Sequence, residues 1–175
     1  MGCYSLEDQL LVNEVGEKAF QLSEMTRDGI PVPKGFVVSN SVFDTKNLSS
    51  IQSEISSYLK SISANAYMVR SSAIGEDGDD ASFAGQLDSF IVSNKIDDII
   101  NHVQKCWDSY SADHVLVYQK AKGKKLAGMG VVIQELVDPD YAGVLFTESH
   151  LAEQTILVEY VEGHGEKLVS GELKE

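Results

Sequence analysis

The chain has 175 residues, of which 43% are hydrophobic, and a formal net charge of −13. This apolar content excludes wholesale disorder, and no apolar run approaches the roughly 20 residues that cross a bilayer. The acidic balance disfavours nucleic acid and anionic lipid as partners. The N-terminus has no basic segment followed by an apolar one, and two cysteines make no disulfide framework. We therefore expect a cytoplasmic protein without a secretory signal.

Helices and strands alternate through much of the chain, and the last third is rich in strands. Pro139 predicts a hairpin-like turn between the strands at 129–137 and 141–147. This mixture predicts an α+β fold with two small lobes. Apolar spacing and the positions of Gly and Pro predict, in chain order, a helix at 17–27, a strand at 35–39, a helix at 48–61, a strand at 66–71, an acidic loop at 72–81, a strand at 83–92, helices at 96–107 and 112–122, and strands at 129–137, 141–147 and 155–160.

One of the two arginines stands in the segment Val69-Arg70-Ser71-Ser72-Ala73, which precedes the small-residue segment Ala81–Gln86. The strand at 66–71 is expected to carry Arg70 to its C-terminal end. A guanidinium beside a loop of small residues can grip phosphate oxygens together with backbone amides. The alternatives are a buried ion pair or a surface arginine beside an acidic turn.

A second cation, Lys18, follows Gly16 and Glu17 at the start of the helix at 17–27. A helix N-terminus offers free amides and a favourable dipole for an anion, and an ammonium group adds to both. The alternative is an ordinary exposed lysine on a helix. Because the chain is acidic overall, an anion site has to be local, and Lys18 and Arg70 are the leading candidates to build it.

The order of these segments and four others resembles the N-terminal ATP-binding domain of the pyruvate phosphate dikinase and phosphoenolpyruvate synthase family. The resemblance covers about Asn13 to Glu172 and implies an ATP-grasp-like fold. The chain would be a partial ATP-grasp domain, with a helix and strand lobe at about 1–125 and a strand-rich segment at 126–175. The other segments that carry the resemblance are Gly29–Val38, Val131–Val137, Ala142–Thr147 and Gly163–Glu172.

The resemblance assigns roles at the phosphate end of the nucleotide. Lys18 matches the phosphate-contacting lysine of the family's Gly-Gly-Lys motif, although Glu17 replaces the second glycine. That replacement alters the backbone or places negative charge near the phosphates. Arg70 matches the arginine that contacts the ATP phosphates, and it is the catalytic residue that the resemblance implies. Gly85 and Ser89 fall in the loop that folds over the triphosphate, with Ser89 in place of the usual threonine.

The resemblance also assigns the base end of the nucleotide. The segment Gln134–Val137 matches the family's hinge, where adenine lies in an apolar slot and is read mainly by backbone groups. The side chains of Gln134 and Glu135 would add hydrogen bonds to the base. The alternative from the residues alone is a buried strand end.

The family implies that the full enzyme uses ATP and Mg²⁺ to phosphorylate a histidine on a swivelling domain. That group then passes to pyruvate and gives phosphoenolpyruvate, with both small molecules bound through other domains. Because the family's metal ligands follow Ser170-Gly171-Glu172, we expect a C-terminally incomplete domain, either truncated or degenerate, that is inactive alone. Rifampin phosphotransferases and glucan water dikinases share the domain and remain alternatives, as does a non-catalytic nucleotide-binding module.

Overall fold

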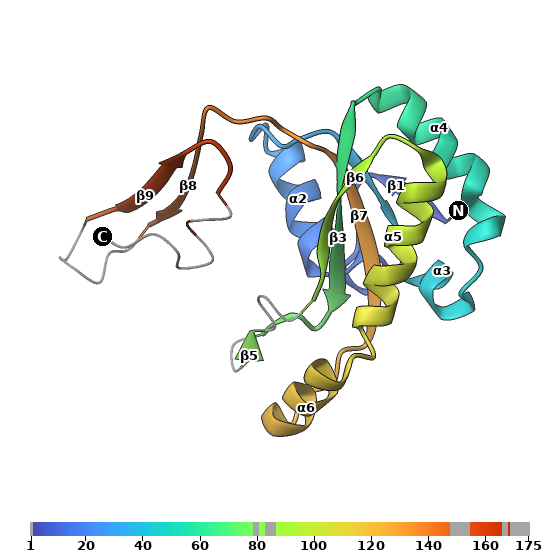
Figure 1. The fold of residues 1–175 in the computed structure, drawn as a ribbon. Helices are drawn as coiled ribbons and strands as arrows, with labels where there is room; N and C mark the ends of the chain where they lie inside the picture. The colour runs from blue at the N-terminus through green and yellow to red at the C-terminus, as the bar shows by residue number, and fades with distance from the viewer. Residues whose placement is uncertain (1, 79–80, 83–86, 148–154, 166–167, 169–175) are drawn as a thin grey trace. The chain divides into compact units, whose positions relative to one another are not determined.

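The computed structural model describes residues 2–78, 81–82, 87–147, 155–165 and 168. The chain divides into two compact units, residues 1–136 and residues 137–175. Figure 1 shows the elements of both units. In chain order they are β1 (Cys3–Ser5), α1 (Val12–Val15), α2 (Glu17–Arg27), β2 (Gly35–Val38), α3 (Asn40–Thr45), a 3₁₀ turn (Leu48–Ile51), α4 (Gln52–Ile62), β3 (Ala66–Ile74), β4 (Asp77–Gly78), β5 (Ala81–Ser82), β6 (Ser89–Ser93), α5 (Ile96–Ser109), α6 (Asp113–Lys122), β7 (Gly128–Glu135), β8 (Tyr141–Phe146) and β9 (Leu157–Glu162).

The first unit is built on a five-stranded sheet in the order β1-β2-β7-β3-β6, with every neighbouring pair antiparallel. The central strand β7 contains the apolar run Val131–Ile133, which is fully buried. Strands that are covered on both faces read as continuous apolar runs instead of alternating ones. This explains why β7 was easy to predict and why it lies at the centre of the sheet.

Helices cover both faces of this sheet, and a separate apolar cluster fills each interface (Figure 1). The larger cluster joins Val69 of β3 to Ile55 of α4 and Trp107 of α5. The smaller cluster joins Val132 of β7 to Ala19 of α2. Since alternate strand residues point to opposite faces, β1, β2 and β7 contribute to both clusters, whereas β3 and β6 contribute to the larger one alone, and this burial fixes the register of the sheet.

The predicted α+β class is confirmed, and α2 has the predicted bounds. The helix α5 begins at the predicted Ile96 and extends past Trp107 to Ser109. β1, α1 and α3 were not predicted, because these elements are too short to show a helical or strand period.

Two local predictions are wrong. β3 continues to Ile74, because the small buried residues Ser71–Ala73 pair with β7 instead of forming a loop. Arg70 therefore lies in the middle of its strand and not at its end. The predicted hairpin at Pro139 is also wrong, since β7 pairs with β2 and β3 while β8 pairs with β9. As a result β7 belongs to the first unit, and the units divide after Leu136.

Both cysteines are free and fully buried in the first unit, in agreement with the absence of a disulfide framework. Burial raises the pKa of the Cys3 thiol to about 12 and that of the Cys106 thiol to about 11. Buried neutral thiols behave as small apolar side chains, so both contribute to packing rather than to chemistry.

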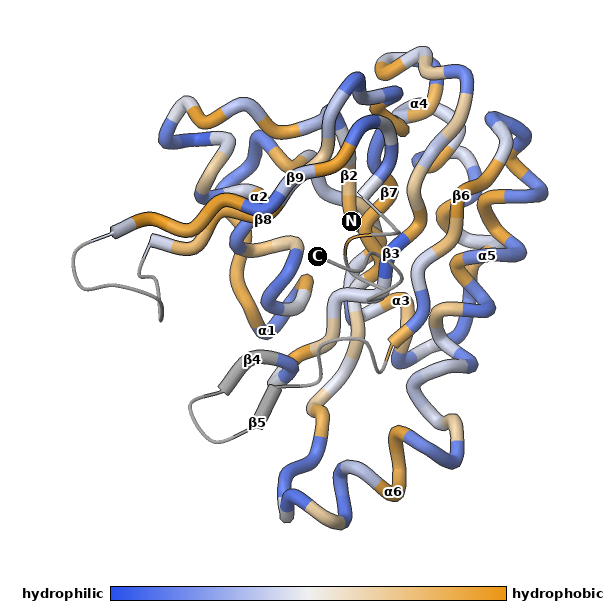
Figure 2. The backbone as a smooth tube through the Cα atoms, turned by 60° about the vertical axis from the view of Figure 1, so that its left-hand side comes forward, coloured by the Kyte–Doolittle hydropathy of each residue, from blue (hydrophilic) through white to orange (hydrophobic). Residues whose placement is uncertain are grey.

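The second unit contains the antiparallel hairpin of β8 and β9. Large apolar side chains are exposed along it, including Tyr141, Leu145, Val158 and Tyr160. Figure 2 shows the same strands as predominantly hydrophobic. In the part of the chain that the structure describes, no helix combines the length and the apolar character that crossing a membrane requires.

Candidate functional site

The start of α2 lies directly against β3, and Gly16 makes this approach possible. Gly16 has φ 79°, and a Cβ atom there would overlap the backbone carbonyl of Ser72. The Ser72 hydroxyl accepts a hydrogen bond of 2.9 Å from the Ala19 amide. One of the free amides at the helix N-terminus is thereby satisfied by the neighbouring strand. We call this junction, formed by residues 16–19 and 70–76, the α2–β3 corner.

Lys18 reaches from α2 across to β3 and to the turn that follows it. Its Nζ donates to the Ser71 carbonyl oxygen at 2.8 Å and to the two carboxylate oxygens of Glu76 at 3.1 and 3.2 Å. The side chain of Glu76 is 9% exposed and that of Lys18 is 26% exposed. The ammonium group is therefore held in one place by its three contacts, while the side chain as a whole stays partly exposed.

Glu17 does not point its carboxylate into open space. Its Oε1 accepts a hydrogen bond from the Gly75 amide at 2.7 Å, and its Oε2 accepts one from the Glu76 amide at 3.4 Å. The Glu76 carboxylate in turn accepts from the Ala73 amide at 3.3 Å. These contacts connect α2 to the turn after β3, so the residue that replaces a motif glycine has a definite structural role.

Arg70 lies on the same face of the sheet as α2. Its partner in β7 is Val132, which packs in the smaller apolar cluster with Ala19 of α2. Burial lowers the pKa of the Arg70 guanidinium, and the negative charge of Glu76 opposes that shift. Arginine nevertheless stays protonated in proteins. Within the described residues, no hydrogen bond or ion pair involves Arg70.

Ser89 begins β6 directly opposite Arg70 in the sheet. It is exposed, and Ile91 on the same face is 50% exposed. The helix α2 contacts β3 and β7, whereas β6 receives α5 on its other face. Within the described residues, the edge of the sheet beside Arg70 is thus exposed on the α2 face at Ser89 and Ile91.

Gln134 and Glu135 lie at the far end of β7. Gln134 pairs with Met68 and is therefore on the same face as Arg70, while Glu135 belongs to the opposite face. Both side chains hold the loop before β2. The Gln134 Nε2 donates to the Pro33 carbonyl at 3.0 Å, and the Glu135 Oε1 accepts from the Lys34 amide at 2.9 Å.

The structure thus brings Lys18, Arg70 and Ser89 into one neighbourhood and places Gln134 farther along the same face. Gly85 lies outside the described residues. The sequence analysis missed Glu76 because it assigned that position to a solvated acidic loop. A carboxylate that closely follows a strand carrying an arginine was the available signal for it.

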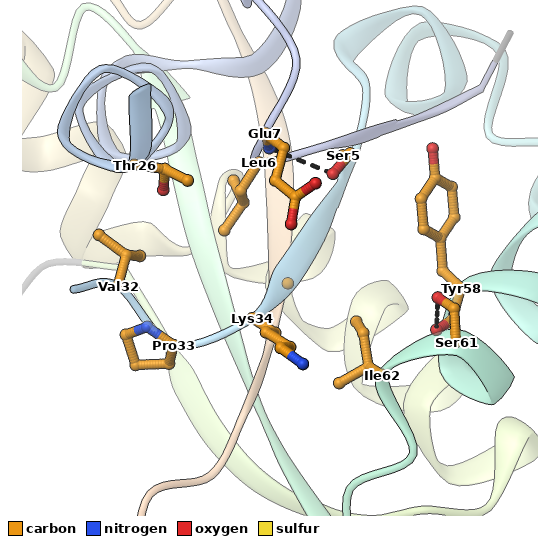
Figure 3. A pocket seen from close by; sticks show the side chains of 11 residues that line it. Ser5, Leu6, Glu7, Thr26, Val32, Pro33, Lys34, Tyr58, Ser61 and Ile62 are labelled. Carbon is orange, nitrogen blue, oxygen red and sulfur yellow. Dashed lines mark hydrogen bonds between the residues drawn. The ribbon is translucent and has the colours of Figure 1, made fainter. Parts of the chain in front are cut away.

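A hollow of about 290 Å³ lies elsewhere in the first unit, among β1, the C-terminal halves of α2 and α4, and the loop before β2. Figure 3 shows Tyr58 and Ile62 of α4, Thr26 of α2 and Lys34 around it. None of the sequence-predicted site residues is among the described side chains that line it. The hollow and the α2–β3 corner are therefore separate features.

Within the described residues, no three His, Cys, Asp or Glu side chains gather in a group that could hold a metal ion. A Mg²⁺ ion that accompanies a nucleotide usually takes one or two carboxylates plus phosphate oxygens. The described residues do not provide a separate metal centre. The α2–β3 corner combines the cations of Lys18 and Arg70 with the carboxylates of Glu17 and Glu76.

Comparison with known proteins identifies relatives over most of the chain. The family described as "Pyruvate phosphate dikinase, AMP/ATP-binding domain" matches residues 44–175. A probable phosphoenolpyruvate synthase of Methanothermobacter thermautotrophicus is 32% identical, over 91% of this chain and 31% of its own length. A rifampicin phosphotransferase of a Streptomyces species is 31% identical, over 90% of this chain and 24% of its own.

A prodigiosin synthesizing transferase of Serratia marcescens is 30% identical, over 92% of this chain and 21% of its own length. The chain therefore spans less than a third of the length of each of these three relatives. The three relatives are named for different compounds, namely phosphoenolpyruvate, rifampicin and prodigiosin.

Proposed function

The chain belongs to the family of the pyruvate phosphate dikinase AMP/ATP-binding domain, as its motifs predicted, and from this premise we propose that the α2–β3 corner holds the phosphates of ATP. The domain is of the ATP-grasp-like kind and is the ATP-binding part of a phosphotransferase. In this proposal Lys18, Arg70 and Ser89 are the residues that hold the phosphates.

The observation that supports this proposal most strongly is the position of Arg70. A partly buried guanidinium that feels the charge of Glu76 but donates no hydrogen bond within the described residues is costly, unless a ligand accepts hydrogen bonds from it. A phosphate group has the charge and the acceptor geometry that a guanidinium binds best. Lys18 would add a second cation, and the Ser89 hydroxyl would add a hydrogen bond from the opposite strand.

The spacing along the sheet matches the two ends of a nucleotide. Lys18 is anchored at the carbonyl of Ser71, and the partner of Ser71 in β7 is Val131. Gln134 stands three residues farther along β7 than Val131. At about 3.3 Å per residue this is roughly 10 Å. The base would then lie near Gln134 at the end of β7, whereas the Glu135 side chain is on the opposite face of the sheet. The partly exposed side chain of Ile91 is in line with Gln134 across the sheet, since both pair with Met68, and would provide apolar surface at the base end.

Mg²⁺ would enter with ATP and neutralise charge on its phosphates, which is the chemistry that such enzymes require of it.

For the whole protein we propose transfer of a phosphoryl group to a histidine and then to pyruvate. An antibiotic acceptor is the alternative, because a rifampicin phosphotransferase is among the relatives. Location in the cytoplasm stays a prediction.

Calorimetric titration tests whether the α2–β3 corner binds phosphate, by comparing the affinity for ATP in the presence of Mg²⁺ with the affinity for adenosine. Charged hydrogen bonds contribute about 1.5–3 kcal/mol each, so ATP should bind at least about tenfold more tightly than adenosine. The preference should weaken as salt is raised, because part of the site is exposed. Absence of ATP binding at millimolar concentration, or equal affinities for the two compounds, would contradict the proposal.

A further inference from the structure

The α2–β3 corner contains a chain of contacts that begins at Glu17 and ends at the Lys18 ammonium. Glu17 accepts from the amides of Gly75 and Glu76, and the carboxylate of Glu76 binds Lys18. Glu17 is 58 residues from Gly75 and 59 residues from Glu76 along the chain, and Lys18 is 58 residues from Glu76. These are therefore tertiary contacts and not local helix contacts.

We propose that Glu17 is a positioning residue, which fixes the Gly75–Glu76 turn so that Glu76 and the Ser71 carbonyl hold Lys18 at the phosphate site. The proposal rests on the assigned role of Lys18 in binding ATP. Lysine has a flexible stem with several rotatable bonds, and a pre-organised ammonium group loses less rotamer entropy on binding. Glu17 acts on the ligand only through the turn and through Lys18.

The competing account treats Glu17 simply as a negative charge that repels phosphate. The two accounts predict opposite signs. A purely repulsive carboxylate would be a hindrance, and its neutralisation would tighten ATP binding. The geometry favours the positioning role, because both carboxylate oxygens of Glu17 are already engaged by backbone amides. A carboxylate that accepts two amide hydrogen bonds has much of its charge compensated.

The test compares Glu17→Gln with Glu24→Gln in the full chain. Glu24 lies on the same helix and pairs with Arg27, so its neutralisation changes the charge of α2 equally without touching the turn. Glu17→Gln keeps one acceptor oxygen for Gly75 but presents an amide group to the Glu76 N–H. We expect amide hydrogen exchange at Gly75 and Glu76 to become about tenfold faster in Glu17→Gln, and ATP to bind about 5- to 10-fold more weakly. Glu24→Gln should change neither quantity.

A double-mutant cycle with Lys18→Ala separates positioning from general damage to the fold. If Glu17 acts through Lys18, Glu17→Gln should have little further effect on ATP affinity once Lys18 is absent. Equal effects of Glu17→Gln in both backgrounds, tighter ATP binding in Glu17→Gln, or unchanged exchange at Gly75 and Glu76 would each overturn the proposal.

Selective acylation of lysines, followed by mass spectrometry, reports on Lys18 without any nucleotide. Release from Glu76 should increase the labelling of Lys18 in Glu17→Gln relative to wild type and to Glu24→Gln. If the wild-type chain binds no ATP, the proposed function fails, yet exchange and labelling still decide whether Glu17 positions Lys18. Unchanged labelling of Lys18 in Glu17→Gln would contradict the positioning role of Glu17.

Discussion

Replacing Gly16 with alanine should lower the free energy of unfolding by about 2–4 kcal/mol. The new Cβ atom would overlap the carbonyl group and hydroxyl of Ser72, so α2 would have to move away from β3. Overpacking of this kind costs about 1–3 kcal/mol, and the positive φ of 79° adds about 1 kcal/mol for a residue with a side chain. Urea denaturation followed by circular dichroism measures the loss.

Gly29 provides a control that is matched in φ, because it also has φ 79° but no neighbouring atom within 4 Å among the described residues. Gly29→Ala should therefore cost only the conformational term, about 1 kcal/mol. The difference between the two variants is the cost of separating α2 from β3. Similar losses in both variants would show that the close approach of Gly16 to Ser72 contributes nothing to stability.

Replacing Arg70 with methionine should weaken ATP binding by about 10- to 100-fold and leave adenosine binding nearly unchanged. The loss corresponds to removal of charge-assisted hydrogen bonds to phosphate, which contribute about 1.5–3 kcal/mol. The stability of the nucleotide-free chain should rise or stay the same, because the substitution removes a partly buried cation without partners among the described residues. Calorimetry and urea denaturation measure the two quantities.

Arg27→Met is the control for Arg70, since it removes the chain's other arginine from an exposed ion pair with Glu24. It should alter neither nucleotide affinity nor, by more than about 0.5 kcal/mol, stability. If Arg70→Met instead destabilised the chain by several kcal/mol while ATP still bound, Arg70 would be a structural residue.

Sequence patterns predicted the elements whose apolar residues recur at a clear period. α2 and α5 show helical spacing, and β7 is a continuous apolar run between Gly128 and Glu135. The end of β3 could not be predicted, because serines and alanine carry no strand signal and their burial results from pairing with β7. Pairing with a neighbouring strand, and not the local preference of the residues, determines the secondary structure of such segments.

The candidate site was predicted in part. Lys18 and Arg70 were identifiable because cations are scarce in an acidic chain and both stand beside small residues. The contact between Lys18 and Glu76 joins residues 58 positions apart, and no local pattern indicates such a distance. The role of Glu17 could not be predicted for the same reason. From the sequence it was a departure from a motif, whereas in the structure it anchors the Gly75–Glu76 turn.

Amide NMR of the isotopically labelled chain during titration with ATP and Mg²⁺ tests the central claim most directly. If the α2–β3 corner holds the phosphates, saturable shifts should appear at Lys18, Arg70 and Ser89, and adenosine should not reproduce them. Shifts confined to the hollow near Lys34 and Tyr58, or the same shifts with adenosine, would contradict the claim that this corner binds phosphate.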